Sequence, residues 1–369
     1  MFRTFRTFRA VRHAPVLASP SHRASHAFLS HLAPVNKIRS TLQELDVDNF
    51  RDQAFKPELP LLITDDSAPA AGEAASKSMF SACGVPAVKR WFESRKEADV
   101  NGGSRILYGL QKQYLMPFKD VMVPIEMISY SDQPSTGHAV NPLQIFREEL
   151  KRQGETDLSS YLPELPEVCA AQVEAFHSFY GPLGLFLFAV QGGPLTDEHE
   201  TNGRRASGPH KLYIAQAKIA DLPAQLQKDF PTPRIVLEAG KGDIYDANIW
   251  VGVPPTYTPL HRDPNPNLFL QLAGDKAIRL FRPDVGRAIF NAVQAEIGGY
   301  ASPVFRGEEM MQGPERKLLE EAVWQNPPDD GYEVVVKPGN ALFIPRGWWH
   351  SIKSSSQDEV NGSVNWWFR

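Results

Sequence analysis

Cysteine and long apolar runs are both scarce in this sequence of 369 residues. The only two cysteines are Cys83 and Cys169, which lie too far apart for the spacing of a zinc-binding motif. A disulfide framework is therefore excluded, and the chain suits a reducing compartment. No apolar run approaches the roughly 20 residues that cross a bilayer, so no membrane partner is expected.

Acidic residues are missing ahead of Glu44, although residues 1–40 contain seven Lys and Arg and several serines. This composition is typical of a mitochondrial transit peptide, so we interpret residues 1–40 as a segment that targets the protein to the mitochondrial matrix. A disordered basic tail with affinity for nucleic acid, in a cytoplasmic or nuclear protein, is the alternative. Without the segment, 32 basic residues face 43 acidic ones, a net charge of −11. Such a body is a poor general nucleic-acid binder, because phosphate contacts need Lys and Arg.

Proline and glycine, by contrast, are plentiful, with 31 and 26 residues. They indicate short elements joined by many turns. In the last 160 or so residues, apolar runs alternate with turns, which predicts strands at 212–218, 244–252, 267–272, 276–281, 333–336, 341–344 and 363–369. Gly274-Asp275 between two of these strands predicts a tight hairpin. The pattern favours a mainly β sandwich or barrel with flanking helices.

The rest of the chain is organised around this β region, for which we predict the bounds 211–369. Residues 41–210 are interpreted as an α/β region that packs on it, with strands at 61–64, 122–128 and 184–191 and loops at 66–78 and 195–210. A helix is expected over 142–153, between the N-cap Asn141 and the terminating Gly154. Residues 284–330 form an insertion with its own helix near 315–324, expected over the rim of the barrel.

The pattern His261-Arg262-Asp263 is the first sign of chemistry. In a strand, residues two apart point to the same face, so His261 and Asp263 can converge on one metal ion. His350, on a neighbouring strand, can complete the set of two His and one carboxylate used by non-haem Fe(II) oxygenases. Three ligands leave about three positions open for a chelating 2-keto acid and O₂. Alone, a His-x-Asp pattern more often marks a surface turn.

Three further features favour a metal site over a surface turn. Lys276 lies 15 residues after His261, and an ammonium inside a barrel is costly unless it meets an anion such as a ligand carboxylate. Thr258 can add a hydroxyl to the same carboxylate. His350 follows an apolar strand and two tryptophans, which can shield the site. Asn365 is on the opposite strand face from Trp366, and a buried amide needs partners that a keto acid can supply.

At these residues the chain resembles the JmjC-domain hydroxylases of the cupin superfamily. The resemblance runs from about Leu212 to Arg369 and rests on three segments: 258–271 (TPLHRDPNPNLFLQ), 343–350 (FIPRGWWH) and 363–367 (SVNWW). It implies a double-stranded β-helix, the cupin or jelly-roll barrel. It also implies that Fe(II) is bound by His261, Asp263 and His350, which are thus the catalytic set.

The same resemblance assigns the remaining pocket residues. Lys276, Thr258 and Tyr213 are expected to bind the distal carboxylate of 2-oxoglutarate, and Asn267 and Asn365 to supply amides near the keto acid. Trp250 resembles an aromatic residue at the substrate mouth. The implied reaction consumes O₂ and 2-oxoglutarate, hydroxylates the substrate, and releases succinate and CO₂, with ascorbate as a supporting reductant.

Four functions stay open at this point. A protein or peptide side-chain hydroxylase fits best, because the chain has no zinc cluster of a chromatin-reading module. The alternatives are a JmjC lysine demethylase, a tRNA-base hydroxylase, and a non-redox metal-binding cupin. A non-redox metal-binding cupin would have no role for Lys276 and Asn365. Many JmjC hydroxylases form homodimers, so a dimer is open as well, but the substrate and the hydroxylated atom do not follow from the sequence.

Overall fold

The fold is taken from a computed structural model, which describes residues 32–64, 84–98, 103–130, 142–164, 174–190, 211–299, 311–355 and 360–369. All of them belong to one unit of the chain, Leu32–Arg369. Among these residues, no helix is both long and apolar enough to span a bilayer. Both cysteines, most of the predicted transit peptide and the predicted loops at 66–78 and 195–210 lie outside the described residues. The division at residues 40 and 210 stays a prediction.

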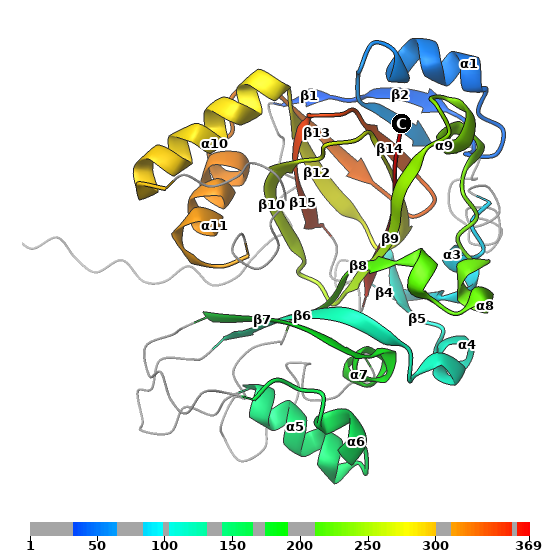
Figure 1. The fold of residues 1–369 in the computed structure, drawn as a ribbon, viewed down its shortest axis with the longest axis vertical. Helices are drawn as coiled ribbons and strands as arrows, with labels where there is room; N and C mark the ends of the chain where they lie inside the picture. Colours follow the sequence, from blue (N-terminus) through cyan, green and yellow to red (C-terminus); the bar gives the residue numbers. More distant parts are fainter. Residues whose placement is uncertain are drawn as a thin grey trace, which may run out of the picture. The chain divides into compact units, whose positions relative to one another are not determined.

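Two large β-sheets form the centre of the described unit (Figure 1). One has five strands in the order β1 (Ala33–Pro34), β13 (Gly331–Val336), β12 (Lys276–Phe281), β15 (Trp349–Ser354) and β10 (Tyr257–Arg262). The other has nine strands in the order β2 (Asn36–Arg39), β3 (Leu61–Thr64), β14 (Ala341–Ile344), β11 (Asn267–Ala273), β16 (Asn361–Phe368), β9 (Ile244–Gly252), β8 (Lys211–Lys218), β6 (Met122–Tyr130) and β7 (Glu174–Pro182). The strands predicted from residue 212 onward are all present, within two residues at their starts. The mainly β jelly roll with flanking helices is therefore confirmed.

From β9 to β12, and again from β13 to β16, consecutive strands alternate between the two sheets. β10 and β12 belong to the five-stranded sheet, whereas β11 between them belongs to the nine-stranded sheet. The predicted hairpin at Gly274-Asp275 is therefore wrong. Gly274 adopts φ +65°, a left-handed conformation that suits glycine, but the turn carries the chain across to the other sheet. Turn chemistry predicts a change of direction, and it does not show which strand the chain pairs with next.

The space between the sheets is apolar at one end. Phe269, Leu342 and Ile344 from the nine-stranded sheet pack against Ile278, Leu280 and Val336 from the five-stranded sheet. These side chains alternate along their strands with residues that face outward, as a half-buried strand requires. The polar residues singled out from the sequence lie between the same two sheets, beyond this cluster.

A larger apolar cluster covers the outer face of the nine-stranded sheet. It includes side chains from α1 (Val47–Phe50), α3 (Ala87–Arg90), α5 (Pro142–Arg152) and α7 (Leu183–Ala189). The helix predicted over 142–153 is confirmed as α5. The strand predicted at 184–191 is wrong, because residues 183–189 are helical and nearly all of them are buried. A run that is apolar on every side has no period by which helix and strand can be told apart.

The remaining described elements are short and complete this outer layer. Asp46 is the N-cap of α1, since its carboxylate accepts a hydrogen bond from the backbone N–H of Asn49. The other elements are η1 (Arg51–Phe55), the hairpin of β4 (Phe92–Ala98) and β5 (Ser104–Leu110), α4 (Lys112–Leu115), η2 (Met116–Phe118), α6 (Thr156–Ser159), η3 (Ile219–Asp221), α8 (Ala224–Gln227) and α9 (Arg234–Glu238).

The predicted insertion covers the outer face of the five-stranded sheet rather than its rim (Figure 1). It contains α10 (Pro283–Ile297), α11 (Gly313–Glu320) and η5 (Glu321–Gln325), so the helix predicted near 315–324 is confirmed. Phe290 and Leu319 from these helices pack with Leu260, Phe281 and Trp349 of the sheet. These three sheet residues point away from the other sheet. The insertion therefore stabilises the strands that carry the predicted metal ligands.

Gly286 of α10 is expected to be essential for this packing. A Cβ atom at residue 286 would lie 2.1 Å from Cγ of Trp349. Because such overpacking forces a buried ring or a whole helix to move, Gly286→Ala should lower the free energy of unfolding by about 1–3 kcal/mol. Urea unfolding measures this loss, with Arg287→Ala on the exposed face of the same helix as the control. Equal stability of the two variants would contradict the packing role.

Candidate functional site

Two histidines and one aspartate meet between the sheets. His261 on β10 is directly opposite His350 on β15 in the strand register, and their ring centroids are 4.3 Å apart. Asp263 follows the end of β10, and its carboxylate oxygens lie 4.0 Å from Nε2 of His261 and 3.6 Å from Nε2 of His350. One potential ligand atom from each residue lies within 4.8 Å of the others. All three side chains are buried.

The backbone fixes which nitrogen of each histidine faces this centre. Nδ1 of His261 is 2.8 Å from the carbonyl oxygen of Pro259, and Nδ1 of His350 is 3.2 Å from that of Trp348. A carbonyl oxygen only accepts hydrogen bonds, so each Nδ1 carries the proton. In the neutral ring, Nε2 then presents its lone pair to the centre, which is the form that binds a metal.

The environment also keeps His261 neutral. Burial lowers the pKa of His261, the nearby His350 lowers it further, and Asp263 opposes the change only in part. Two neutral imidazoles and one carboxylate form the donor set that suits Fe(II) and leaves open coordination positions. The residues present therefore fit the metal that the sequence predicted.

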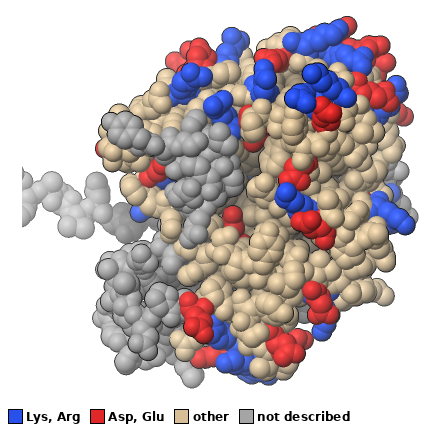
Figure 2. Space-filling model, in the orientation of Figure 1, with Lys and Arg blue, Asp and Glu red and all other residues tan. Residues whose placement is uncertain are grey.

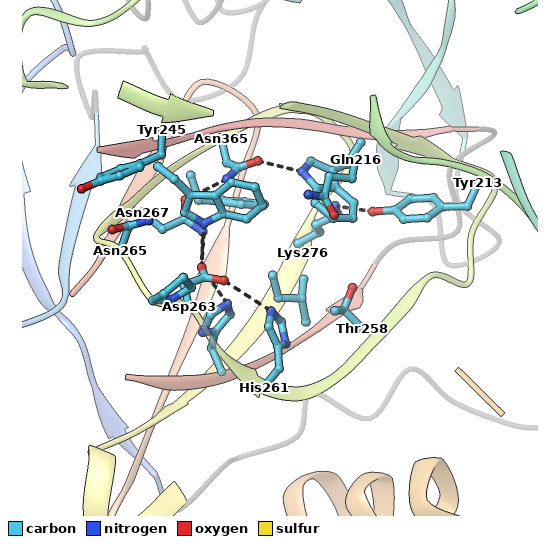
Figure 3. A pocket seen from close by; sticks show the side chains of 16 residues that line it. Tyr213, Gln216, Tyr245, Thr258, His261, Asp263, Asn265, Asn267, Lys276 and Asn365 are labelled. Carbon is cyan, nitrogen blue, oxygen red and sulfur yellow. Dashed lines mark hydrogen bonds and ion pairs between the residues drawn. The ribbon is translucent and has the colours of Figure 1, made fainter. Parts of the chain in front are cut away.

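A hydrogen-bonded chain orients the carboxylate of Asp263 (Figure 3). Its Oδ2 accepts hydrogen bonds from Nδ2 of Asn267 at 2.8 Å and from Nε1 of Trp367 at 2.9 Å. Asn365 donates to Oδ1 of Asn267 at 3.3 Å and accepts from Nε1 of Trp250 at 2.8 Å. Each amide is held by its neighbour, so the position of the carboxylate depends on several strands at once.

A bulge in β10 places Thr258 and His261 in one pocket. Residues three apart in a regular strand face opposite sides. The register pairs Thr258 with Ile352 and His261 with His350, so three steps on β10 match two on β15. The extra residue turns both side chains inward and leaves Leu260 outside, in the cluster beneath the insertion.

Lys276 is the one buried cation near this centre whose described partners are all neutral. Its Nζ donates to Oγ of Ser363 at 2.9 Å and to the hydroxyl of Tyr213 at 3.4 Å, and only 2% of its surface is exposed. Burial lowers the pKa of Lys276 to about 7. An ammonium among hydroxyls in an apolar wall is a site for an anion, because a carboxylate would restore the lost solvation.

The candidate metal ligands and Lys276 line the same cavity, which has a volume of about 230 Å³. Every site residue predicted from the sequence lines it: Tyr213, Trp250, Thr258, His261, Asp263, Asn267, Lys276, His350 and Asn365. Figure 3 shows the Tyr213 hydroxyl directed at Lys276 on one side and the Asp263 carboxylate on the other. The cavity is therefore bounded by a metal-binding set and an anion-binding set.

Sequence reasoning missed several residues of this site. Ser363 and Trp367 are two residues before and after Asn365, so alternation along the strand could have identified both. Gln216 and Tyr245 also line the pocket, but each lies at a register shift, and Gln216 adopts φ +55°. Bulges turn a side chain against the regular alternation, so no sequence signal was available for these two.

Trp367 should hold the metal through Asp263. Removing an outer hydrogen bond from a metal ligand typically weakens metal binding by about 10- to 100-fold, so Trp367→Phe should raise the Kd for Co(II) by about tenfold. Competition with a fluorescent chelator measures this Kd. Trp366→Phe on the opposite face of the same strand is the matched control. The prediction is contradicted if both variants bind Co(II) equally well.

Comparison with known proteins now identifies the region that carries this site. Residues 195–369 match the family model described as a cupin-like domain. JmjC domain-containing protein D of Dictyostelium discoideum is 30% identical over 155 residues, which are 39% of this chain and 33% of the relative. Lysine-specific demethylase 8 of Danio rerio is 27% identical over 157 residues, 42% of this chain and 36% of the relative.

A third relative, lysine-specific demethylase JMJ30 of Arabidopsis thaliana, is 26% identical over 164 residues, 44% of this chain and 35% of the relative. The matched region thus spans about a third of the length of these curated relatives. The segment that matches the family model, residues 195–369, contains both histidines and the aspartate of the candidate metal-binding set. Residues 195–369, just under half of the chain, are therefore similar to the cupin-like domain family, and a relative that shares a region of this kind is a JmjC domain-containing protein.

Proposed function

We propose that this chain is an Fe(II)- and 2-oxoglutarate-dependent oxygenase that hydroxylates a protein side chain. The observation that carries the proposal is the placement of the buried Lys276 ammonium in the same cavity as His261, Asp263 and His350. A metal-binding set beside a site for a carboxylate is what a chelating 2-keto dicarboxylate requires. A non-redox cupin would have no use for the lysine, whose burial is costly without an anion.

One set of pocket residues would bind the metal, and another set would bind the co-substrate. His261, Asp263 and His350 would hold the iron, which when bound uses O₂ and 2-oxoglutarate to hydroxylate a substrate C–H bond, with release of succinate and CO₂. Lys276 and the hydroxyls of Tyr213 and Thr258 would bind the distal carboxylate. This arrangement fixes the orientation of the 2-keto acid at both ends before the substrate enters.

The chain's other pocket residues would keep this arrangement rigid and dry. Asn267 and Asn365 link the Asp263 carboxylate to Trp250 by hydrogen bonds. Phe269 lies over the Lys276 ammonium, with Nζ 5.4 Å from the ring centroid. Aromatic rings around the charged groups exclude water, which strengthens the attraction between the ammonium and a bound carboxylate.

The face of the molecule drawn in Figure 2 favours a protein substrate over an RNA one. On the face shown in Figure 2, Lys and Arg lie beside Asp and Glu and form no continuous basic area among the described residues. Binding of a tRNA depends on Lys and Arg that neutralise several phosphates. A protein substrate has no such requirement, so it is the substrate class we propose.

Lysine demethylation is a second candidate, because two of the relatives named above are lysine-specific demethylases. The same iron chemistry would hydroxylate an N-methyl group, which then leaves as formaldehyde. Trp250, Tyr245 and Trp367 line the pocket, and aromatic faces attract methylated ammonium groups. Formaldehyde release with a methyl-lysine peptide would favour this candidate over a stable hydroxylated product.

Succinate release tests the proposal directly. Purified protein with Fe(II), 2-oxoglutarate and ascorbate should form succinate, even without substrate, and a substrate protein should gain one oxygen atom by mass spectrometry. His261→Ala and Lys276→Met should each reduce succinate formation by at least about 100-fold, because a buried charged group or ligand is lost. Lys89→Met, on the exposed side of α3, should keep the parent rate. No succinate from the parent under any condition would refute the proposal.

Binding of 2-oxoglutarate should weaken as the pH rises above 7. In the free pocket the pKa of Lys276 is about 7, whereas a bound carboxylate favours the charged ammonium and raises that pKa. Binding therefore takes up a proton above pH 7, and the affinity should fall by up to about tenfold per pH unit from there. Titration calorimetry of Mn(II)-loaded protein between pH 6 and 9 measures this slope. A slope that persists in Lys276→Met would assign it to another group.

A further inference from the structure

Gly252 is an unusual residue for its position in β9. The inner face of a strand normally carries a side chain, and glycine weakens a strand unless another group approaches the backbone closely. Gly252 is not among the described glycines with positive φ, so its backbone conformation does not require glycine. The need for glycine at this position therefore arises from the group that packs against it.

The ring of Tyr213 occupies the space where a side chain at residue 252 would be. Tyr213 on β8 is directly opposite Gly252 in the strand register. A Cβ atom built on Gly252 would lie 2.0 Å from Cδ2 and 2.7 Å from Cε2 of the Tyr213 ring. Both distances are far below a van der Waals contact. The tyrosine ring therefore lies across the backbone of β9, in a slot that only glycine leaves open.

This slot determines where the Tyr213 hydroxyl points. With the ring in place, the hydroxyl accepts a hydrogen bond from Nζ of Lys276 at 3.4 Å and faces the cavity of about 230 Å³ (Figure 3). Tyr213 also lines a second cavity of about 30 Å³. A side chain at residue 252 would push the ring away from β9 and so move its hydroxyl relative to Lys276.

We propose that Gly252 is a positioning residue, which seats the Tyr213 ring and so holds its hydroxyl beside Lys276 for a carboxylate of the co-substrate. The role of the carboxylate rests on the proposed function, whereas the seating of the ring does not. In this role Gly252 acts on the carboxylate site through the Tyr213 ring, which lies against it.

A double-mutant cycle, in the absence of metal and co-substrate, tests whether Gly252 positions the Tyr213 ring. Gly252→Ala should lower the Tm of the metal-free protein by more than about 2 °C, because the ring is displaced. In the Tyr213→Ala background the added methyl group has room, so the same substitution should change the Tm by less than about 1 °C. An equal loss in both backgrounds would overturn the proposal.

The consequence for the co-substrate is measured by titration of 2-oxoglutarate into Mn(II)-loaded protein. Gly252→Ala should weaken 2-oxoglutarate binding by about tenfold, close to the loss caused by Tyr213→Phe, because both remove one hydrogen bond to a charged group. The affinity for Mn(II) should stay within twofold of the parent. A parallel loss of metal affinity would show a general disturbance of the pocket and would overturn the proposal.

Gly331→Ala is the matched control, because it creates the same kind of contact outside the pocket. Gly331 on β13 is directly opposite Phe281, and a Cβ atom there would lie 2.6 Å from Cε1 of that ring. This variant should lower the Tm but leave 2-oxoglutarate binding within twofold of the parent; tenfold weakening would overturn the specific role of Gly252. If the unsubstituted protein binds no 2-oxoglutarate, the proposed function fails, and the ligand-free cycle still decides whether Gly252 seats Tyr213.

Discussion

The pairing of β10 with β15 is the constraint on which the site depends. It sets His261 directly opposite His350, and the bulge after Thr258 turns a third pocket residue to the same side. A slip of β15 by one residue would send His350 to the outer face, away from His261, since strand side chains alternate. Apolar packing on both faces of the sheet opposes such a slip, with Ile278 and Leu280 inside and Phe281 and Trp349 outside. The geometry of the candidate site is thus secured by the same burial that stabilises the fold.

Part of this site could be predicted from alternation along strands and from the cost of burying charged or polar groups, whereas Tyr213, Trp250 and Asn267 followed only from the resemblance to the JmjC hydroxylases. His261 and Asp263 are two apart, Lys276 begins a strand, and Asn365 lies within one. The failures have equally physical causes. Residues 184–191 are apolar throughout, so the period that separates helix from strand was absent. The turn at Gly274 was recognised, but the sheet that receives the next strand is decided by contacts distant in sequence. Gln216 and Tyr245 lie at bulges, which interrupt alternation.

Polar groups inside the jelly roll are tolerated because nearly all of those in the pocket are linked. Trp250, Asn365, Asn267 and Asp263 form one hydrogen-bonded series, and Lys276 is held by two hydroxyls. A satisfied network of this kind specifies one arrangement, whereas a broken one leaves a buried group without a partner. The two charged groups of the pocket differ in their surroundings. The aspartate is already fully oriented by its neighbours, while the ammonium still lacks a counter-charge among the described residues.

Strand β15 has a mechanical consequence for the metal-binding set. Trp349 points outward and packs against Phe290 of α10, with ring centroids 5.3 Å apart, and the next residue, His350, points inward as a candidate metal ligand. Adjacent Cα atoms are separated by about 3.8 Å across one rigid peptide unit. A shift of the outer helix is therefore transmitted to the imidazole by the main chain itself. Substitutions in the insertion can therefore change the geometry of the candidate metal site without altering any residue inside the pocket.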